Sequence, residues 1–124
     1  MADKDLEVIK KTKALVKRTY QVTSNPKHYP KKYRHSLVVE MQKRSMDIYK
    51  LLFEANRMNI KVYGKQRYVL QSKAVTYCEE LMFFIELSYD LGIIGMKRME
   101  SWSKDVADIK HMTLAWRSRD RDRA

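Results

Sequence analysis

The residues of this sequence whose chemistry most clearly indicates a ligand are basic side chains in a stretch without acids. From Val8 to Val39 the chain has nine Lys or Arg residues and no Asp or Glu. Ammonium and guanidinium groups bind phosphate oxygens through charge-assisted hydrogen bonds. We therefore expect this stretch to bind nucleic acid through Lys10, Lys11, Lys13, Lys17, Arg18, Lys27, Lys31, Lys32 and Arg34.

The uneven distribution of charge supports the same interpretation. The net charge is +11, and residues 1–68 contain 17 basic and 6 acidic residues, whereas residues 69–124 contain nine of each. A surface of interspersed, solvated charges would explain the total but not this asymmetry. A polyanionic partner, most simply RNA and possibly DNA, is the natural expectation. The alternative is a scaffold or adaptor whose basic surface meets an acidic protein.

Two tyrosines lie within the basic stretch, in a segment that also contains both prolines of the chain. Residues before proline avoid the α region, so residues 25–35 should form an extended or turning connector. Tyr29 and Tyr33 are candidates for stacking on exposed bases, as occurs in proteins that bind single strands. Alternatively, these rings hold the connector against the rest of the fold.

Apolar residues at helical spacing predict four helices, over residues 5–24, 34–58, 66–91 and 96–116. With 3 Gly and 2 Pro in 124 residues, we expect an all-α, up-down-up-down antiparallel four-helix bundle over residues 1–116. Residues 117–124 alternate in charge, so we expect a disordered tail. Its arginines either contact phosphates or only keep the protein in solution.

The second predicted helix has the most regular pattern. Its core stripe takes alternating steps of three and four residues, through Val38, Met41, Ser45, Ile48, Leu52 and Ala55. Its opposite face carries acid–base pairs three residues apart, namely Glu40–Lys43, Asp47–Lys50 and Glu54–Arg57. Such pairs stabilise a helix by a few tenths of a kcal/mol, which indicates a solvated surface that neutralises itself.

The third predicted helix has more apolar residues than a monomeric bundle needs. One stripe follows the heptad spacing, through Leu70, Ala74, Tyr77, Leu81, Phe84, Ser88 and Leu91. A second apolar surface lies beside it. We expect this surplus to form a subunit interface in a ring-shaped homo-oligomer, through Met82, Phe83, Ile85 and Tyr89.

No pattern of catalytic or metal-binding residues is found in the sequence. The three glycines are too scattered to form a phosphate-binding loop. The three histidines do not form a metal-ligand pattern with Cys78. We therefore expect no enzymatic activity, no metal and no cofactor.

The single cysteine excludes an intramolecular disulfide and is typical of a reducing compartment. The first residues lack an apolar run of signal-peptide length, and the longest apolar run is far shorter than the ~20 residues of a membrane span. These features predict a cytoplasmic protein that does not bind membranes.

The order of these features resembles a known family. A basic connector with Pro30, Lys31 and Arg34 precedes a helix that ends in the sequence LLFEAN. A long apolar helix ends in Leu91 and Gly92, and the last helix closes in a Trp followed by basic residues. This pattern resembles the accessory variability determinant (Avd) of diversity-generating retroelements. That protein belongs to a wider four-helix-bundle family, which includes proteins encoded by intervening sequences in ribosomal RNA genes.

The resemblance implies a strongly basic, non-catalytic homopentamer. Such a protein binds the reverse transcriptase and template RNA of its retroelement and supports mutagenic synthesis of complementary DNA. The ribosomal branch usually carries a SIPxNIAEG-like signature on its second helix. This chain lacks that signature, which favours the Avd branch over a ribosomal-RNA intervening-sequence protein.

Overall fold

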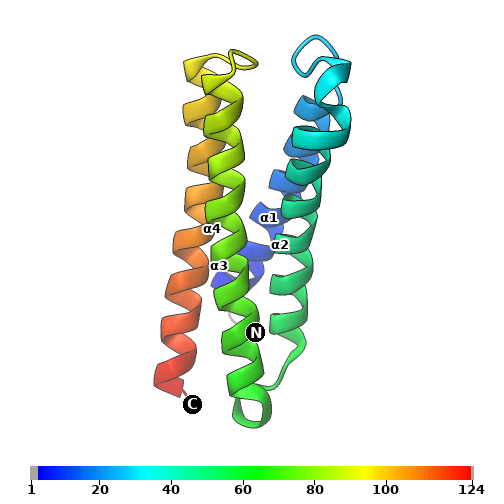
Figure 1. Ribbon diagram of the computed structural model, residues 1–124. Coiled ribbons are helices and arrows are strands. Elements are labelled where there is room, and N and C mark those ends of the chain that lie inside the picture. Colours follow the sequence, from blue (N-terminus) through cyan, green and yellow to red (C-terminus); the bar gives the residue numbers. More distant parts are fainter. Residues whose placement is uncertain (1–2, 124) are drawn as a thin grey trace.

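The computed structural model describes residues 3–123, and over them the chain is all-α, without strands (Figure 1). The all-α class and the four helices expected from the sequence are therefore confirmed. A single 3₁₀ turn and a π-helical turn, Lys31–Tyr33 and Arg34–Val38, lead into the second α-helix. The four α-helices are α1 (Asp3–Thr23), α2 (Val39–Arg57), α3 (Ile60–Asp90) and α4 (Met96–Arg123).

The loops gather at two opposite ends of the bundle (Figure 1). One end, here called the connector end, contains residues 24–38 between α1 and α2 and residues 91–95 between α3 and α4. The other end contains the link between α2 and α3 and the last turns of α4. Helix α3 is central, because it packs extensively against both α2 and α4.

The core of α2 follows the predicted stripe at every position. Val38, at the end of the π-helical turn, is 7% exposed, and the side chains from Met41 to Ala55 on this stripe are fully buried. Two tryptophans of α4, Trp102 and Trp116, are also fully buried. Large aromatic side chains of this kind contribute much of the apolar area that stabilises a small bundle.

The predicted core stripe of α3 is right at Ala74, Leu81 and Ser88, which are fully buried. It is wrong at Tyr77 and Phe84, which are only partly buried at the edge of the core. The next residue in each case, Cys78 or Ile85, is fully buried instead. The assignment of Ile85 to a subunit interface is therefore also wrong. Neighbouring residues on a helix point about 100° apart, and periodicity alone does not tell which of two adjacent apolar stripes faces the bundle centre.

The predicted boundaries of α3 and α4 are wrong at the end of the bundle away from the connector. Helix α3 begins at Ile60 rather than at 66, with a kink at Tyr63 (φ −118°, ψ 31°). The Asn59 side chain caps it by accepting a hydrogen bond from the backbone N–H of Lys61 at 2.9 Å.

The expected tail is helical to Arg123, because Asp120 is buried against α3. The prediction of disorder over 117–123 is therefore wrong. Residues 1–2, included in the predicted domain, and residue 124 of the predicted tail lie outside the described residues. The other boundaries agree within a few residues, apart from the π-helical turn that opens the second predicted helix.

Candidate nucleic-acid interface

The outward face of α1 presents an exposed row of lysines. Lys10, Lys13 and Lys17 lie on the side of the helix opposite its buried residues, and all three are exposed. The core side of α1 is rich in threonine, and the Thr12 and Thr23 hydroxyls donate to backbone carbonyls four residues earlier. The burial of that face directs these three lysines into solvent, where a polyanion can reach them.

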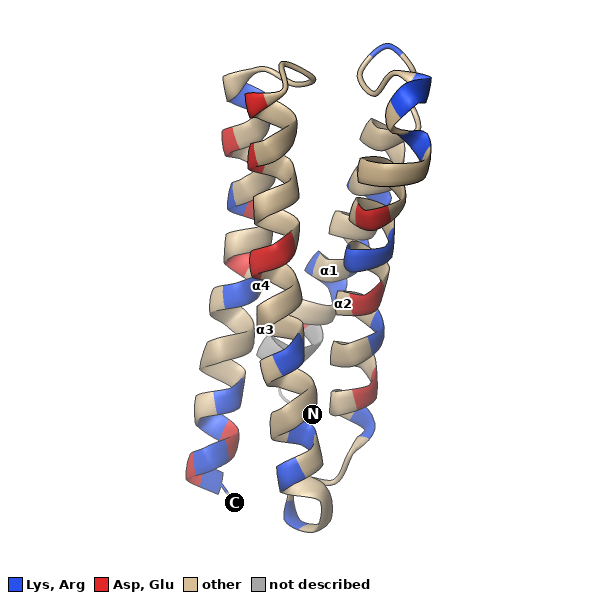
Figure 2. Cartoon of the chain, viewed as in Figure 1, with Lys and Arg blue, Asp and Glu red and all other residues tan. Residues whose placement is uncertain are grey.

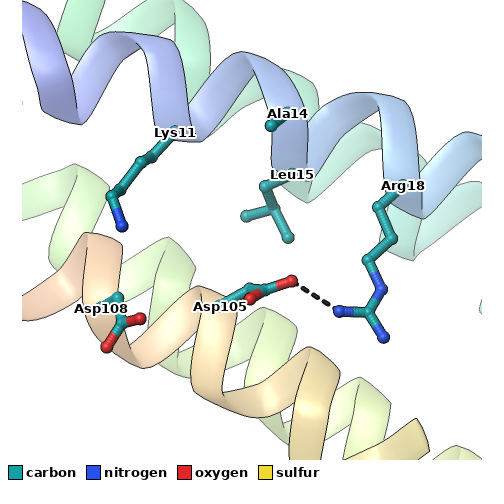
Figure 3. Close-up of a pocket in the computed structure, with 6 residues that line it drawn as sticks. All are labelled: Lys11, Ala14, Leu15, Arg18, Asp105 and Asp108. Atoms are coloured by element: carbon teal, nitrogen blue, oxygen red, sulfur yellow. Dashed lines mark hydrogen bonds and ion pairs between the residues drawn. The ribbon is translucent and has the colours of Figure 1, made fainter.

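Two of the predicted binding residues on α1 instead face acids of α4 (Figure 3). The Arg18 guanidinium donates to the Asp105 carboxylate at 2.5 Å and to the Ser101 hydroxyl at 3.2 Å. Lys11 and Asp108 line the same pocket of about 260 Å³ between the two helices. Part of the positive charge of α1 is thus matched by α4, so Arg18 is less available to a phosphate than the outward lysines.

The remaining predicted bases, Lys27, Lys31, Lys32 and Arg34, are exposed at the connector end. Tyr29 holds this segment in place, since its hydroxyl donates to the Ser88 hydroxyl of α3 at 2.9 Å. Burial raises the pKa of this phenol, although the Ser88 hydrogen bond and the charge of Arg98 oppose the shift. The connector is therefore fixed to the bundle at one buried ring.

The structure contradicts the prediction that Tyr29 stacks on a base. Its residue is 3% exposed, so no base can reach the ring, and the alternative role of holding the connector is confirmed. Tyr33 is half-buried against the core, with the Lys32 ammonium 5.2 Å from its ring centroid. Of the two tyrosines, only Tyr33 retains a surface for stacking.

The charged face of α2 is neutralised only in part, and not through the predicted pairs. Lys43 bonds to Asp47 four residues later, at 3.0 Å. Arg44 donates to Glu80 of α3 at 2.7 Å and lies 5.0 Å from the Tyr77 ring centroid. These contacts give Lys43 and Arg44 structural roles within the subunit.

A second basic region, missed in the sequence, lies where α3 begins and α4 ends (Figure 2). Residues 60–69 of α3 and 117–121 of α4 line a pocket of about 800 Å³, here called the α3–α4 groove. Its basic residues are two lysines of α3 and two arginines of α4, namely Lys61, Lys65, Arg117 and Arg121. Its single acid is Asp120.

A buried ion pair fixes the two helices beside this groove. Arg67 donates to both carboxylate oxygens of Asp120, at 2.6 and 3.0 Å, and to the backbone carbonyl of Met58 at 2.9 Å. Gln71 and Arg123 each donate to the same carboxylate at 2.8 Å. Because Asp120 already binds two arginines, it does little to neutralise the other bases of the groove.

Two signals in the sequence point to this region. From Ala55 to Cys78 there are five basic residues and no acid, a second acid-free stretch. The buried positions of α4 continue in steps of three and four from Trp116 to Asp120, and those of α3 extend back through Gln71 to Arg67. A charged residue at a core position of each helix indicates a buried pair.

The surface expected to join subunits is smaller than predicted. Phe83 is 58% exposed, whereas Met82 and Tyr89 are partly buried against the subunit's own core. Ile85 lies inside that core. Phe83 is therefore the member of the predicted interface that most exposes its side chain.

The described residues contain no group of three or more His, Cys, Asp or Glu placed to hold a metal ion. Burial raises the pKa of Cys78 to about 12, so this thiol stays protonated near neutral pH. No helix in the described part of the chain has both the length and the apolar character needed to cross a membrane. Neither a protein-family model, nor a curated protein, nor a solved structure matches the chain.

Proposed function

We propose that this protein is a basic, non-catalytic accessory protein that binds nucleic acid, RNA and possibly DNA, in the cytoplasm. The observation that carries the proposal is the acid-free stretch on α1 and the connector, in which eight of the nine Lys and Arg side chains are exposed. Because the phosphate backbone dominates affinity for nucleic acid, a surface of this kind is sufficient for binding without sequence readout.

The partner in this proposal is the reverse transcriptase of a diversity-generating retroelement. The resemblance of the connector and helix ends to the accessory variability determinant supports this choice. In this role the bundle, with its helices antiparallel, assembles into a ring, and the exposed Phe83 lies at the contact between subunits. Five copies would carry a formal charge of +55, which makes RNA binding tight and steeply dependent on salt.

Fluorescence anisotropy of a labelled RNA at increasing salt tests the binding. We expect log affinity to fall linearly with log salt, because each phosphate contact releases counterions. Reversing three exposed charges of α1, in Lys10→Glu/Lys13→Glu/Lys17→Glu, should weaken binding by about tenfold or more. The matched control reverses three bases of α2, in Lys43→Glu/Lys50→Glu/Arg57→Glu, and should lose less affinity.

Two outcomes would contradict the proposal. A salt-independent affinity would exclude phosphate contacts as the basis of binding. A larger loss from the α2 variant than from the α1 variant would move the binding surface to the other helix. The ring is tested separately by light scattering, where a clean monomer at micromolar concentration would exclude it.

A further inference from the structure

We propose that the α3–α4 groove binds a single strand of nucleic acid. In this proposal Tyr68 stacks on a nucleobase, and the lysines and arginines of both helices hold the flanking phosphates. This inference rests on the proposed function, because it assigns a second contact site for the same ligand. It places base stacking at the opposite end of the bundle from Tyr29 and Tyr33.

Tyr68 is positioned as a stacking platform. Its residue is 43% exposed, and the Arg117 guanidinium carbon lies 4.9 Å from the ring centroid. Arg117 is itself held by a 2.9 Å hydrogen bond to the Ser72 hydroxyl. The cation covers one face of the ring and restrains its orientation. The exposed remainder of the ring is available to a base.

The charges around Tyr68 match a strand that runs between the two helices. Lys61 and Lys65 of α3 line the groove on either side of the kink at Tyr63. Arg117 and Arg121 also line it and, being four residues apart, occupy one face of α4. Within the described residues Lys61 and Lys65 form no ion pair. Positive grooves that follow a phosphate backbone beside an aromatic ring are typical of proteins that bind single strands.

The apolar residues of the groove favour an unpaired strand over a duplex. Val62 and Val69 are 68% and 60% exposed beside the basic residues. An unpaired base can cover such surface with its flat face, whereas the bases of a duplex are stacked inside it. The groove therefore suits a ligand that offers both charge and exposed base faces.

An acidic amphipathic helix of a protein is the competing occupant. Such a helix lays its own row of apolar anchors, three or four residues apart, into a continuous hydrophobic groove. On α3 the exposed stripe through Val62 and Val69 is interrupted by Gln66. The exposed apolar surface is thus made of separate side chains. Separate apolar side chains suit individual nucleobases better than the continuous apolar face of a helix.

The test measures the affinity of labelled single-stranded oligo-uridine and of an RNA duplex of equal length for purified full-length variants. Tyr68→Ala should weaken single-strand binding by about 5- to 150-fold, the range that one stacked base contributes, and leave duplex binding nearly unchanged. Tyr68→Phe keeps the ring and should bind like the wild type. Phe53→Ala is the matched control, because Phe53 is similarly exposed, at 44%, but lies on α2, outside both the groove and the acid-free stretch of α1 and the connector.

Three outcomes would overturn the inference. If Tyr68→Ala and Phe53→Ala bind oligo-uridine equally well while the wild type retains salt-dependent binding, the groove is not the site and the proposed function survives. If Tyr68→Ala instead loses binding of an acidic amphipathic peptide, the groove serves a protein. If the wild type binds no RNA at low salt, both the groove site and the proposed function fail.

Discussion

The two ends of the bundle carry charge of the same sign but are built in different ways. At the connector end the lysines and arginines lie on turns and on the connector. The hydrogen bond between the neutral side chains of Tyr29 and Ser88 holds this connector against α3. At the other end the basic residues lie on two α-helices, which the Arg67–Asp120 pair joins. A loop tolerates adjustment to its ligand, whereas groups on helices are placed more exactly. The comparison suggests that the connector end attracts phosphates and that the groove orients bases.

The largest expected effect comes from breaking the anchor beside the groove. Asp120→Ala should lower the free energy of unfolding by about 3–5 kcal/mol, because it leaves the buried Arg67 guanidinium without its main partner. Urea denaturation monitored by circular dichroism measures this change. The matched control is Asp108→Ala, which removes an exposed pair with Lys104 and should cost about 0.5 kcal/mol or less.

The double variant Arg67→Met/Asp120→Leu sharpens this prediction. Replacing both members of a buried pair by apolar residues is often close to neutral, so the double variant should recover much of the lost stability. Equal losses from Asp120→Ala and Asp108→Ala would show that the pair does not anchor the groove end.

A smaller effect is expected from the anchor of the connector end. Tyr29→Phe removes the hydroxyl that donates to Ser88 and should cost about 1 kcal/mol. The loss is moderate because the Ser88 hydroxyl also donates to the Phe84 carbonyl at 2.8 Å. Tyr33→Phe is the control, and thermal unfolding compares the two. Losses of equal size would contradict a specific role for the Tyr29 hydroxyl.

The smallest effect is a pH dependence confined to the connector end. Burial raises the pKa of Tyr29 above 10.0 in the folded protein, so the unfolded chain loses this proton first. The contribution of the neutral phenol to stability is complete below pH 10 and is lost as the pH rises towards the folded value. The unfolding free energy of the wild type should therefore fall more steeply above pH 10 than that of Tyr29→Phe. Parallel curves would contradict the assignment.

The same contrast shows what the sequence can predict. The core of α2 is predictable because its apolar residues form a single stripe opposite charged residues. The core of α3 is not, because two apolar stripes lie side by side and only packing against α2 and α4 decides which residues of each are buried. The groove was missed because its parts are far apart in the sequence. Residues 60–65 and 117–123 lack strong apolar periodicity, and the Arg67–Asp120 contact stabilises them as helices.

The basic surface of α1 was predicted only in part for a related reason. The lysine-rich composition identifies a positive helix, but the acid that pairs with Arg18 comes from α4, as does Asp108 in the pocket that Lys11 lines. Likewise, the sequence shows that Tyr29 is an aromatic residue in a basic connector, but not that its ring is buried. Contacts between distant segments therefore decide which of the predicted residues remain available to a ligand.

One salt titration tests the difference between the two ends most directly. The affinity for labelled oligo-uridine is measured from low to high salt for the wild type, Tyr68→Ala and the connector-end variant Lys27→Gln/Lys31→Gln/Arg34→Gln. The triple variant should flatten the log–log slope by about 2, since each lost contact to a single strand changes it by about 0.7. Tyr68→Ala should lower the affinity by the same factor at every salt concentration, with the wild-type slope. A wild-type slope near zero, or unchanged affinity in both variants, would contradict the account.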